Sequence, residues 1–233
     1  MKRFGLFVVA VLVFGLVGAA RSNATDLIVN GSFENPNVGG GWGMFSNGQV
    51  PGWLTTDSAG DIEIDSPGAI GGTSAYDSNQ SLEVNADNPE DVYQVVNNLV
   101  VGQQYTLFWA YGDRPDSGSQ EMQVYFGPSG SLLPADLVAT DSDIDPTNST
   151  LVWSTNTYTV TATAATEYLS FNGVSFDGEG SPSYGDEIDA VSLDGPEAIA
   201  TPEPATLLLF ASGLGLLFFA WRQRRALPIF GKL

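Results

Sequence analysis

The sequence predicts an all-β fold, an antiparallel sandwich or barrel, between two apolar segments at the ends of the chain. Short stretches of alternating apolar and polar residues recur between residues 25 and 200, as expected for strands with one buried face. Clusters rich in Gly, Asn, Asp and Pro separate them and predict turns. The same range has no amphipathic helical pattern of useful length. Asp26 to Asp194 therefore suits a single sandwich of about eight to ten strands.

Two segments, residues 104–111 and 121–126, show the strand alternation most clearly. Their inward-facing residues are predicted to be Tyr105, Leu107, Trp109 and Tyr111 in the first and Met122, Val124 and Phe126 in the second. The other predicted strands span residues 26–29, 61–64, 81–84, 92–96, 151–154, 157–161, 167–171 and 188–193.

Residues 1–24 have the pattern of a Sec-type signal peptide. The basic start Lys2-Arg3 precedes an apolar stretch over residues 4–20, and the small residues of Ser22-Asn23-Ala24 suit cleavage before Thr25. An uncleaved N-terminal anchor is the alternative. With cleavage, the predicted β-sandwich domain spans residues 25–194.

The C-terminal end combines a Pro-Glu-Pro box, an apolar run and a basic cluster. The two prolines of Pro202, Glu203 and Pro204 block regular helix and keep this stretch extended. Residues 205–221 carry no charge and are just long enough to span a bilayer core. The following arginines would stay on the cytoplasmic side: Arg222, Arg224 and Arg225. We expect a linker over residues 195–204, a transmembrane helix with its basic cluster over 205–225, and a short cytoplasmic tail over 226–233.

Charge and composition exclude several classes of partner and chemistry. Between residues 25 and 200, 26 acidic residues face a single basic residue, Arg114, although the whole chain has a formal charge of only −19. Nucleic acid and anionic lipid are therefore excluded as partners, whereas divalent cations or a salty exterior fit; solubility alone is the other explanation. The chain has no Cys and no His, which excludes disulfides, ordinary zinc sites and Ser-His or Cys-His catalysis. Any metal would be hard and oxygen-ligated, such as calcium.

The C-terminal order of Pro-Glu-Pro box, apolar helix and basic cluster resembles the bacterial PEP-CTERM sorting signal. That resemblance implies that an exosortase, an integral-membrane cysteine peptidase, recognises the Pro202–Pro204 region while the helix anchors the chain transiently in the inner membrane. The chain would be the substrate of this protease and would end in the cell envelope, at the surface or in the extracellular matrix. The tail after the basic cluster is longer than usual, and an ordinary single-pass anchor is the alternative.

Six short motifs of the body, the part of the chain between residues 25 and 200, are similar to those of galactose-binding-domain-like jelly rolls, which include carbohydrate-binding modules. They are Asn30-Gly31-Ser32-Phe33-Glu34, Val50-Pro51-Gly52-Trp53, Gln80-Ser81-Leu82-Glu83-Val84, Val92-Tyr93-Gln94-Val95-Val96, Gly102-Gln103-Gln104-Tyr105-Thr106-Leu107 and Asp189-Ala190-Val191-Ser192-Leu193. The resemblance implies a jelly roll whose first and last strands meet. It also implies a structural calcium held by Glu34 and Asp189, which are otherwise exposed turn acids.

Sugar-binding sandwiches use aromatic side chains for stacking and polar groups for orientation. The predicted ligand contacts here are Trp42, Tyr111, Arg114 and Tyr125. Trp42 is expected in a flexible Gly-rich loop, whereas Trp53 and Trp109 are expected in the core. Arg114 has a structural ion pair as its alternative role.

The sequence as a whole predicts an exported, surface-sorted protein that binds extracellular polysaccharide or another glycan. No residue pattern assigns catalytic residues, so we expect no enzymatic activity. A structural matrix or adhesion protein without a defined sugar ligand is the first alternative. A secreted polysaccharide hydrolase is the less favoured one.

Overall fold

A computed structural model gives the fold of most of the body of the chain. It describes residues 25–72, 74–86, 88–115, 120–142, 150–174, 184–195, 213–215, 217–218 and 221–222. All the described strands lie within one compact unit, Ala24–Pro196.

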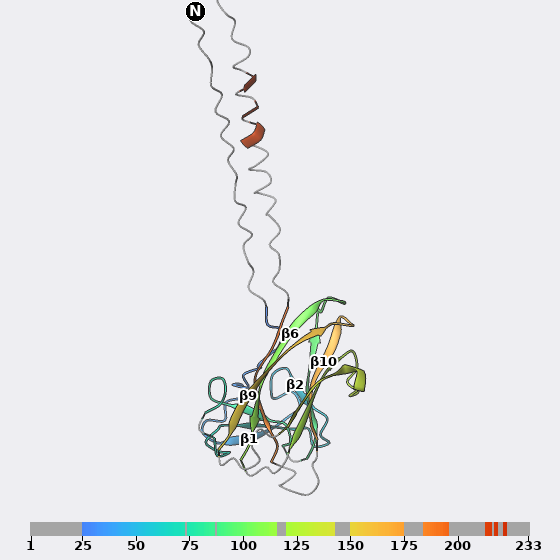
Figure 1. Ribbon diagram of the computed structural model, residues 1–233. Coiled ribbons are helices and arrows are strands. Elements are labelled where there is room, and N and C mark those ends of the chain that lie inside the picture. The colour runs from blue at the N-terminus through green and yellow to red at the C-terminus, as the bar shows by residue number, and fades with distance from the viewer. Residues whose placement is uncertain are drawn as a thin grey trace, which may run out of the picture. The chain divides into compact units, whose positions relative to one another are not determined.

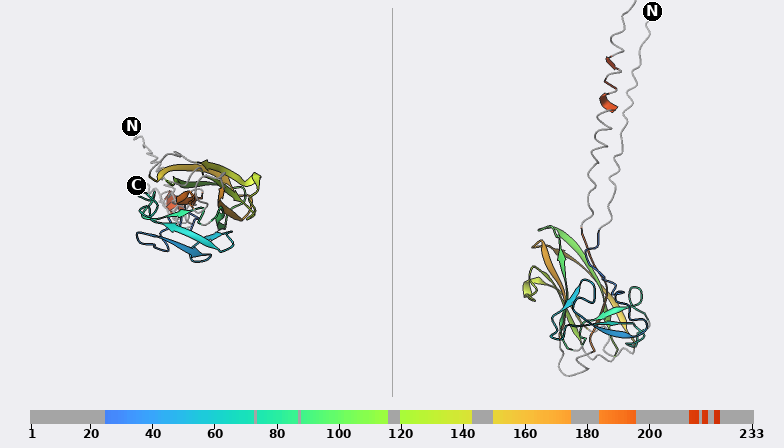
Figure 2. Two further views of the ribbon diagram at one scale, coloured as in Figure 1. Left: turned by 90° about the horizontal axis from the view of Figure 1, so that it is seen from below. Right: turned by 180° about the vertical axis from the view of Figure 1, so that it is seen from behind.

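Eleven strands of the described residues form two antiparallel sheets (Figures 1 and 2). The six-stranded sheet contains, in spatial order, β1 (Trp42–Ser46), β3 (Asp61–Asp65), β4 (Ser81–Glu83), β11 (Glu187–Asp194), β6 (Gln104–Asp113) and β9 (Val152–Thr161). The five-stranded sheet contains β2 (Trp53–Thr55), β5 (Asp91–Asn97), β10 (Thr166–Val174), β7 (Glu121–Gly127) and β8 (Leu137–Ser142). A single 3-10 turn, η1 (Pro134–Asp136), precedes β8. The predicted all-β fold, an antiparallel jelly-roll sandwich, is confirmed.

The core of the sandwich is built from alternate residues of both sheets, because successive side chains of a strand point to opposite faces. The predicted inward residues of β6 and β7 are all buried, which confirms the alternation. Trp53 and Trp109 are fully buried, as predicted, and the Phe171 ring packs near both.

The predicted first strand, residues 26–29, is only an isolated bridge between Asp26 and Asp194. Its polar groups have other partners: Asp26 Oδ1 accepts hydrogen bonds from the amides of Ile28 and Leu193, and the Val29 amide donates to the Gln94 side chain. The two ends of the body still meet, as the resemblance implied. They meet beside β11, which lies inside the six-stranded sheet.

Other boundaries also differ from the predictions. The two strands predicted over residues 151–154 and 157–161 are one strand, β9, which pairs with β6 along its whole length. Three strands were not predicted, namely β1, β2 and β8. The alternation of apolar and polar residues that predicts a strand was concealed by the glycines before β1, by the short length of β2 and by the interrupted alternation of β8.

The flanking segments are mostly outside the described residues. This holds for the signal peptide over 1–24, for Pro202, Glu203 and Pro204, for Arg224 and Arg225, and for the tail over 226–233. In the predicted membrane segment, the described residues are helical, including Arg222. Within the described part of the chain, no helix has the length and apolar character needed to cross a membrane.

Candidate binding site on the six-stranded sheet

The outer face of the six-stranded sheet carries acidic side chains at the positions that alternate with the core. In β3, Ile62 and Ile64 are fully buried in the core, so Glu63 and Asp65 point to the opposite face. In β4, Leu82 points to the core and Glu83 to the outer face by the same alternation.

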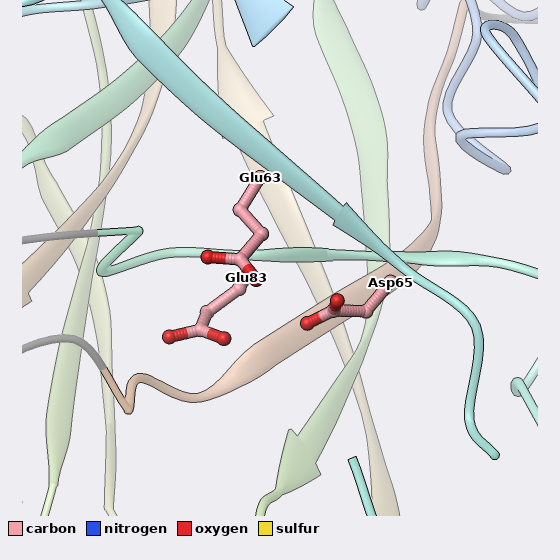
Figure 3. A group of neighbouring side chains, drawn as sticks. All are labelled: Glu63, Asp65 and Glu83. Atoms are coloured by element: carbon pink, nitrogen blue, oxygen red, sulfur yellow. The ribbon is translucent and has the colours of Figure 1, made fainter. Parts of the chain in front are cut away.

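Strand register brings these acids side by side. Glu63 of β3 lies opposite Glu83 of β4, and Glu83 lies opposite Glu187 of β11. Figure 3 shows the carboxyl groups of Glu63, Asp65 and Glu83 gathered in one place. One carboxylate oxygen from each of these three residues lies within 4.8 Å of the others. The group could hold a metal ion.

The loop between β3 and β4, residues 66–80, packs over part of this outer face. The Trp153 indole donates a hydrogen bond to the Ser74 carbonyl, and the Tyr76 ring packs against Phe108. The acids of the outer face are shielded from water although they are not part of the core. Asp65, Glu83 and Glu187 are each 0% exposed.

A pocket of about 530 Å³ opens beside the acids. It is lined by Trp42, Met44, Asp61, Glu63, Asp65, Ala69, Ile70, Ala86, Arg114 and Tyr184. The Trp42 side chain is 62% exposed, which leaves its indole face open to a ligand. Arg114 forms an ion pair with Glu83 and lies over the Tyr184 ring, 4.5 Å from the ring centre. Aromatic, cationic and acidic groups therefore converge on one opening.

Burial changes the protonation of these acids. It raises the pKa of Glu83 to about 11, and the nearby Glu187 charge acts in the same direction while Arg114 opposes it. Burial likewise raises the pKa of Asp65 and places that of Glu187 well above its usual range. Without a cation, burial therefore favours the protonated forms of Glu83, Asp65 and Glu187.

The four predicted ligand contacts fall in three different places. Trp42 and Arg114 line the same pocket, although Trp42 begins β1 and is not in a flexible loop as predicted. Tyr111 is 1% exposed and its hydroxyl donates to Asp186, so it belongs to the core. Tyr125 is partly exposed, on the outer face of the five-stranded sheet, and its hydroxyl donates to Gln123.

Glu34 and Asp189, the predicted calcium ligands, both hold the turn that precedes β4. Glu34 Oε1 accepts hydrogen bonds from the amides of Asn79 and Gln80, at 2.6 and 2.9 Å, and Asp189 Oδ2 accepts one from the Asp77 amide at 2.7 Å. Burial raises the pKa of Asp189 to about 8. Main-chain amides thus donate hydrogen bonds to both carboxylates, and calcium binding by Glu34 and Asp189 stays a prediction.

The acidic group of Glu63, Asp65, Glu83 and Glu187 was not predicted as a site. The only trace in the sequence is the alternation Asp-Ile-Glu-Ile-Asp in β3, which is equally typical of a solvated strand face. The pairing of β3, β4 and β11 is what brings these four acids from three strands into a cluster.

Comparison with known proteins identifies the sorting segment directly. Residues 200–225 match the PEP-CTERM protein-sorting motif, which indicates an exported, envelope-directed protein. Over 205 residues, the chain is 28% identical to halomucin from Haloquadratum walsbyi. The match covers 83% of this chain but 2% of halomucin.

Comparison with solved structures finds chains of similar fold. A cyclase from Fischerella sp. TAU aligns with a TM-score of 0.50 and 16% identity, over 77% of this chain and all of that one. The carbohydrate-binding module and catalytic module of xylanase 10B from Clostridium thermocellum align with a TM-score of 0.41 and 13% identity, over 66% of this chain and 28% of that one. Likeness at this level of identity concerns the fold alone.

Proposed function

We propose that this protein is sorted to the cell surface or matrix and there binds a glycan in the pocket on the six-stranded sheet. The observation that carries the proposal is the exposed indole of Trp42 on a pocket whose lining also includes carboxylates and Arg114. An aromatic face supplies stacking area for a sugar ring, and a few convergent polar groups supply orientation. The sorting motif agrees with a ligand found outside the cell.

The lining favours an uncharged, hydroxyl-rich sugar. The carboxylates of Asp61 and Glu63 accept hydrogen bonds from sugar hydroxyls. Arg114, the cationic residue of the lining, is already paired with Glu83 and stacked on Tyr184. Acidic sugars would meet net negative charge here, so we expect neutral sugars to bind more tightly.

The sorting half of the proposal concerns the two ends of the chain. A Sec-type signal over residues 1–24 starts export, and an exosortase-type protease recognises Pro202–Pro204. The helix over 205–221 presents the chain at the inner membrane, and the arginines fix its orientation. The intact mass of the protein recovered from cells tests this: loss of both ends supports it, and an unprocessed C-terminus contradicts it.

A glycan array probed with the protein tests the binding half. We expect neutral polysaccharide hits that Trp42→Ala abolishes, because the variant removes the stacking surface. Tyr125→Ala is the matched control, since it truncates a partly exposed aromatic on the other sheet. Hits that survive Trp42→Ala but not Tyr125→Ala would place the ligand on the five-stranded sheet and contradict the proposal.

The alternative function is a structural matrix or adhesion protein whose sandwich has no defined sugar ligand. A blank array with correctly folded protein would favour it. We propose no catalytic activity, because Glu83 is held by both Arg114 and the Gly185 amide, and Asp65, although it lines the pocket, is 0% exposed. Turnover of any polysaccharide by the purified protein would overturn that part.

A further inference from the structure

The acidic cluster beside the pocket has features that a solvated acidic surface lacks. Asp65 and Glu187 are 0% exposed, and no donor meets either oxygen of either carboxylate in hydrogen-bond geometry; the polar groups nearest to them are the other carboxyls of the cluster and the Ser81 hydroxyl. A buried polar group without a partner is costly, and an unpaired buried charge costs more still. Two adjacent side chains of this kind indicate a missing electropositive partner.

Arg114, the one basic residue between residues 25 and 195, is already committed. Arg114 pairs with Glu83, whose other oxygen accepts a hydrogen bond of 2.6 Å from the Gly185 amide. If Glu63, Asp65 and Glu187 are also ionised, the cluster holds one guanidinium among four carboxylates. A divalent cation would offset most of the remaining negative charge.

Glu187 is held against the cluster by its surroundings. It lies opposite Glu83 on one side and opposite Gly112 on the other. A Cβ at position 112 would come within 2.9 Å of the Glu187 side chain and 2.7 Å of the Trp153 ring, so glycine is what allows this close packing. The unpartnered carboxyl group is thus fixed beside the acids of β3 and β4.

The spacing of the oxygens suits calcium. Ca²⁺ binds oxygen ligands at about 2.3–2.6 Å, so oxygens on opposite sides of one ion lie up to about 5 Å apart. Three carboxylates that offer oxygens within 4.8 Å of one another fit around such an ion with little movement. Mg²⁺ requires about 2.0–2.1 Å and near-ideal octahedral geometry, and this set fits it less well.

We propose that Glu63, Asp65 and Glu83, with Glu187 alongside, bind a calcium ion beside the pocket on the six-stranded sheet. Because Glu63 and Asp65 also line the pocket, the ion has a route from solvent and an open side for further oxygen ligands. This site is distinct from the predicted pair of Glu34 and Asp189, whose carboxylates serve the turn before β4. It does not depend on glycan binding.

Calorimetric titration of CaCl₂ into the EDTA-treated, desalted full chain tests the site. We expect binding with a dissociation constant of about 10⁻⁴ to 10⁻³ M, the range of extracellular calcium modules. Asp65→Asn and Glu63→Gln should each weaken binding at least about tenfold, because each removes a charged ligand. Glu121→Gln, which removes a partly exposed acid from the other sheet, should leave the affinity unchanged.

Melting curves of the same proteins with and without CaCl₂ separate lost binding from lost folding. Calcium should raise the melting temperature of the wild type and of Glu121→Gln, and should leave that of Asp65→Asn nearly unchanged. The proposal is overturned if calcium gives no heat and no thermal shift in the wild type. It is also overturned if calcium binding persists in Asp65→Asn and Glu63→Gln but is lost in Asp189→Asn. A blank glycan array together with intact calcium binding would contradict the proposed glycan binding but still support the calcium site.

Discussion

The two faces of the six-stranded sheet share the same strands and have opposite chemistry. The inner face presents Ile62, Ile64, Leu82 and Ile188, all 0% exposed, to the core. The outer face presents Glu63, Asp65, Glu83 and Glu187, which are nearly as well buried. Burial of the first set stabilises the fold, whereas burial of the second set opposes it.

This contrast between the two faces shows that burial alone does not define a core. The acids of the outer face are buried, although a soluble sandwich could have left them in water. Buried acids with raised pKa values cluster at functional sites. The outer face is therefore the part of the body to test for binding, and the inner face is the part to test for stability.

The largest effect is expected on the inner face. Leu82→Ala should lower the free energy of unfolding by about 2–5 kcal/mol, because it removes a fully buried side chain and leaves a cavity. Urea denaturation measures the loss. Val101→Ala, at a position 62% exposed, is the control and should change the same quantity by less than about 0.5 kcal/mol. Equal losses of unfolding free energy in the two variants would contradict the distinction between core and surface.

A smaller loss is expected where the outer face is most tightly packed. Gly112→Ala should cost about 1–3 kcal/mol, because its new methyl group collides with Trp153 and Glu187. Gly40→Ala is the matched control, since a Cβ there meets nothing within 4 Å. Equal stability of the two variants in urea would show that Glu187 is not held as tightly as the structure indicates.

The pH dependence of stability extends the comparison to carboxyl groups of the other sheet. Burial raises the pKa values of Glu90 and Asp91 to about 7, although Thr55 donates a hydrogen bond to Glu90. The folded state then binds more protons than the unfolded chain between about pH 4 and pH 7, so stability falls as the pH rises through that window.

In EDTA, the melting temperature should therefore be several degrees lower at pH 8 than at pH 5. Glu90→Gln and Asp91→Asn should each flatten this dependence. A melting temperature that rises from pH 5 to pH 8 in the wild type would contradict the raised pKa values.

The smallest change in stability is expected at the pocket. Trp42→Ala should alter the free energy of unfolding by less than about 0.5 kcal/mol, because the side chain is largely exposed, while it removes glycan binding. Denaturation and array measurements on the same preparation check both expectations. A large loss of stability would show that Trp42 supports the fold and would weaken its assignment to a ligand.

Sequence patterns predicted the fold well wherever strands alternate strictly. The residues of β6 and β7 were assigned to the correct faces, because one buried face imposes a period of two. Strand β1 was missed since the glycines before it and Gly43 within it conceal any alternation, yet Trp42 was correctly expected to be exposed. The sorting motif was also predicted, because it is a contiguous pattern that needs no tertiary structure.

The acidic cluster could not be predicted because it depends on register. Glu63, Glu83 and Glu187 lie far apart in the sequence and meet only through the pairing of β3, β4 and β11. For Tyr111, too, the sequence pattern alone could not decide between two roles. It was predicted both to face inward and to contact a ligand, and its packing places it in the core with its hydroxyl on Asp186.

The unfolding free energy of Asp65→Asn in EDTA at pH 8, compared with that of the wild type, tests the central contrast most directly. If the outer acids oppose folding until a cation binds them, the variant should be more stable by about 1 kcal/mol or more, because at pH 8 the amide requires neither a buried charge nor the uptake of a proton on folding. A variant less stable than the wild type would show that the Asp65 carboxylate supports the fold by itself, and would contradict the account.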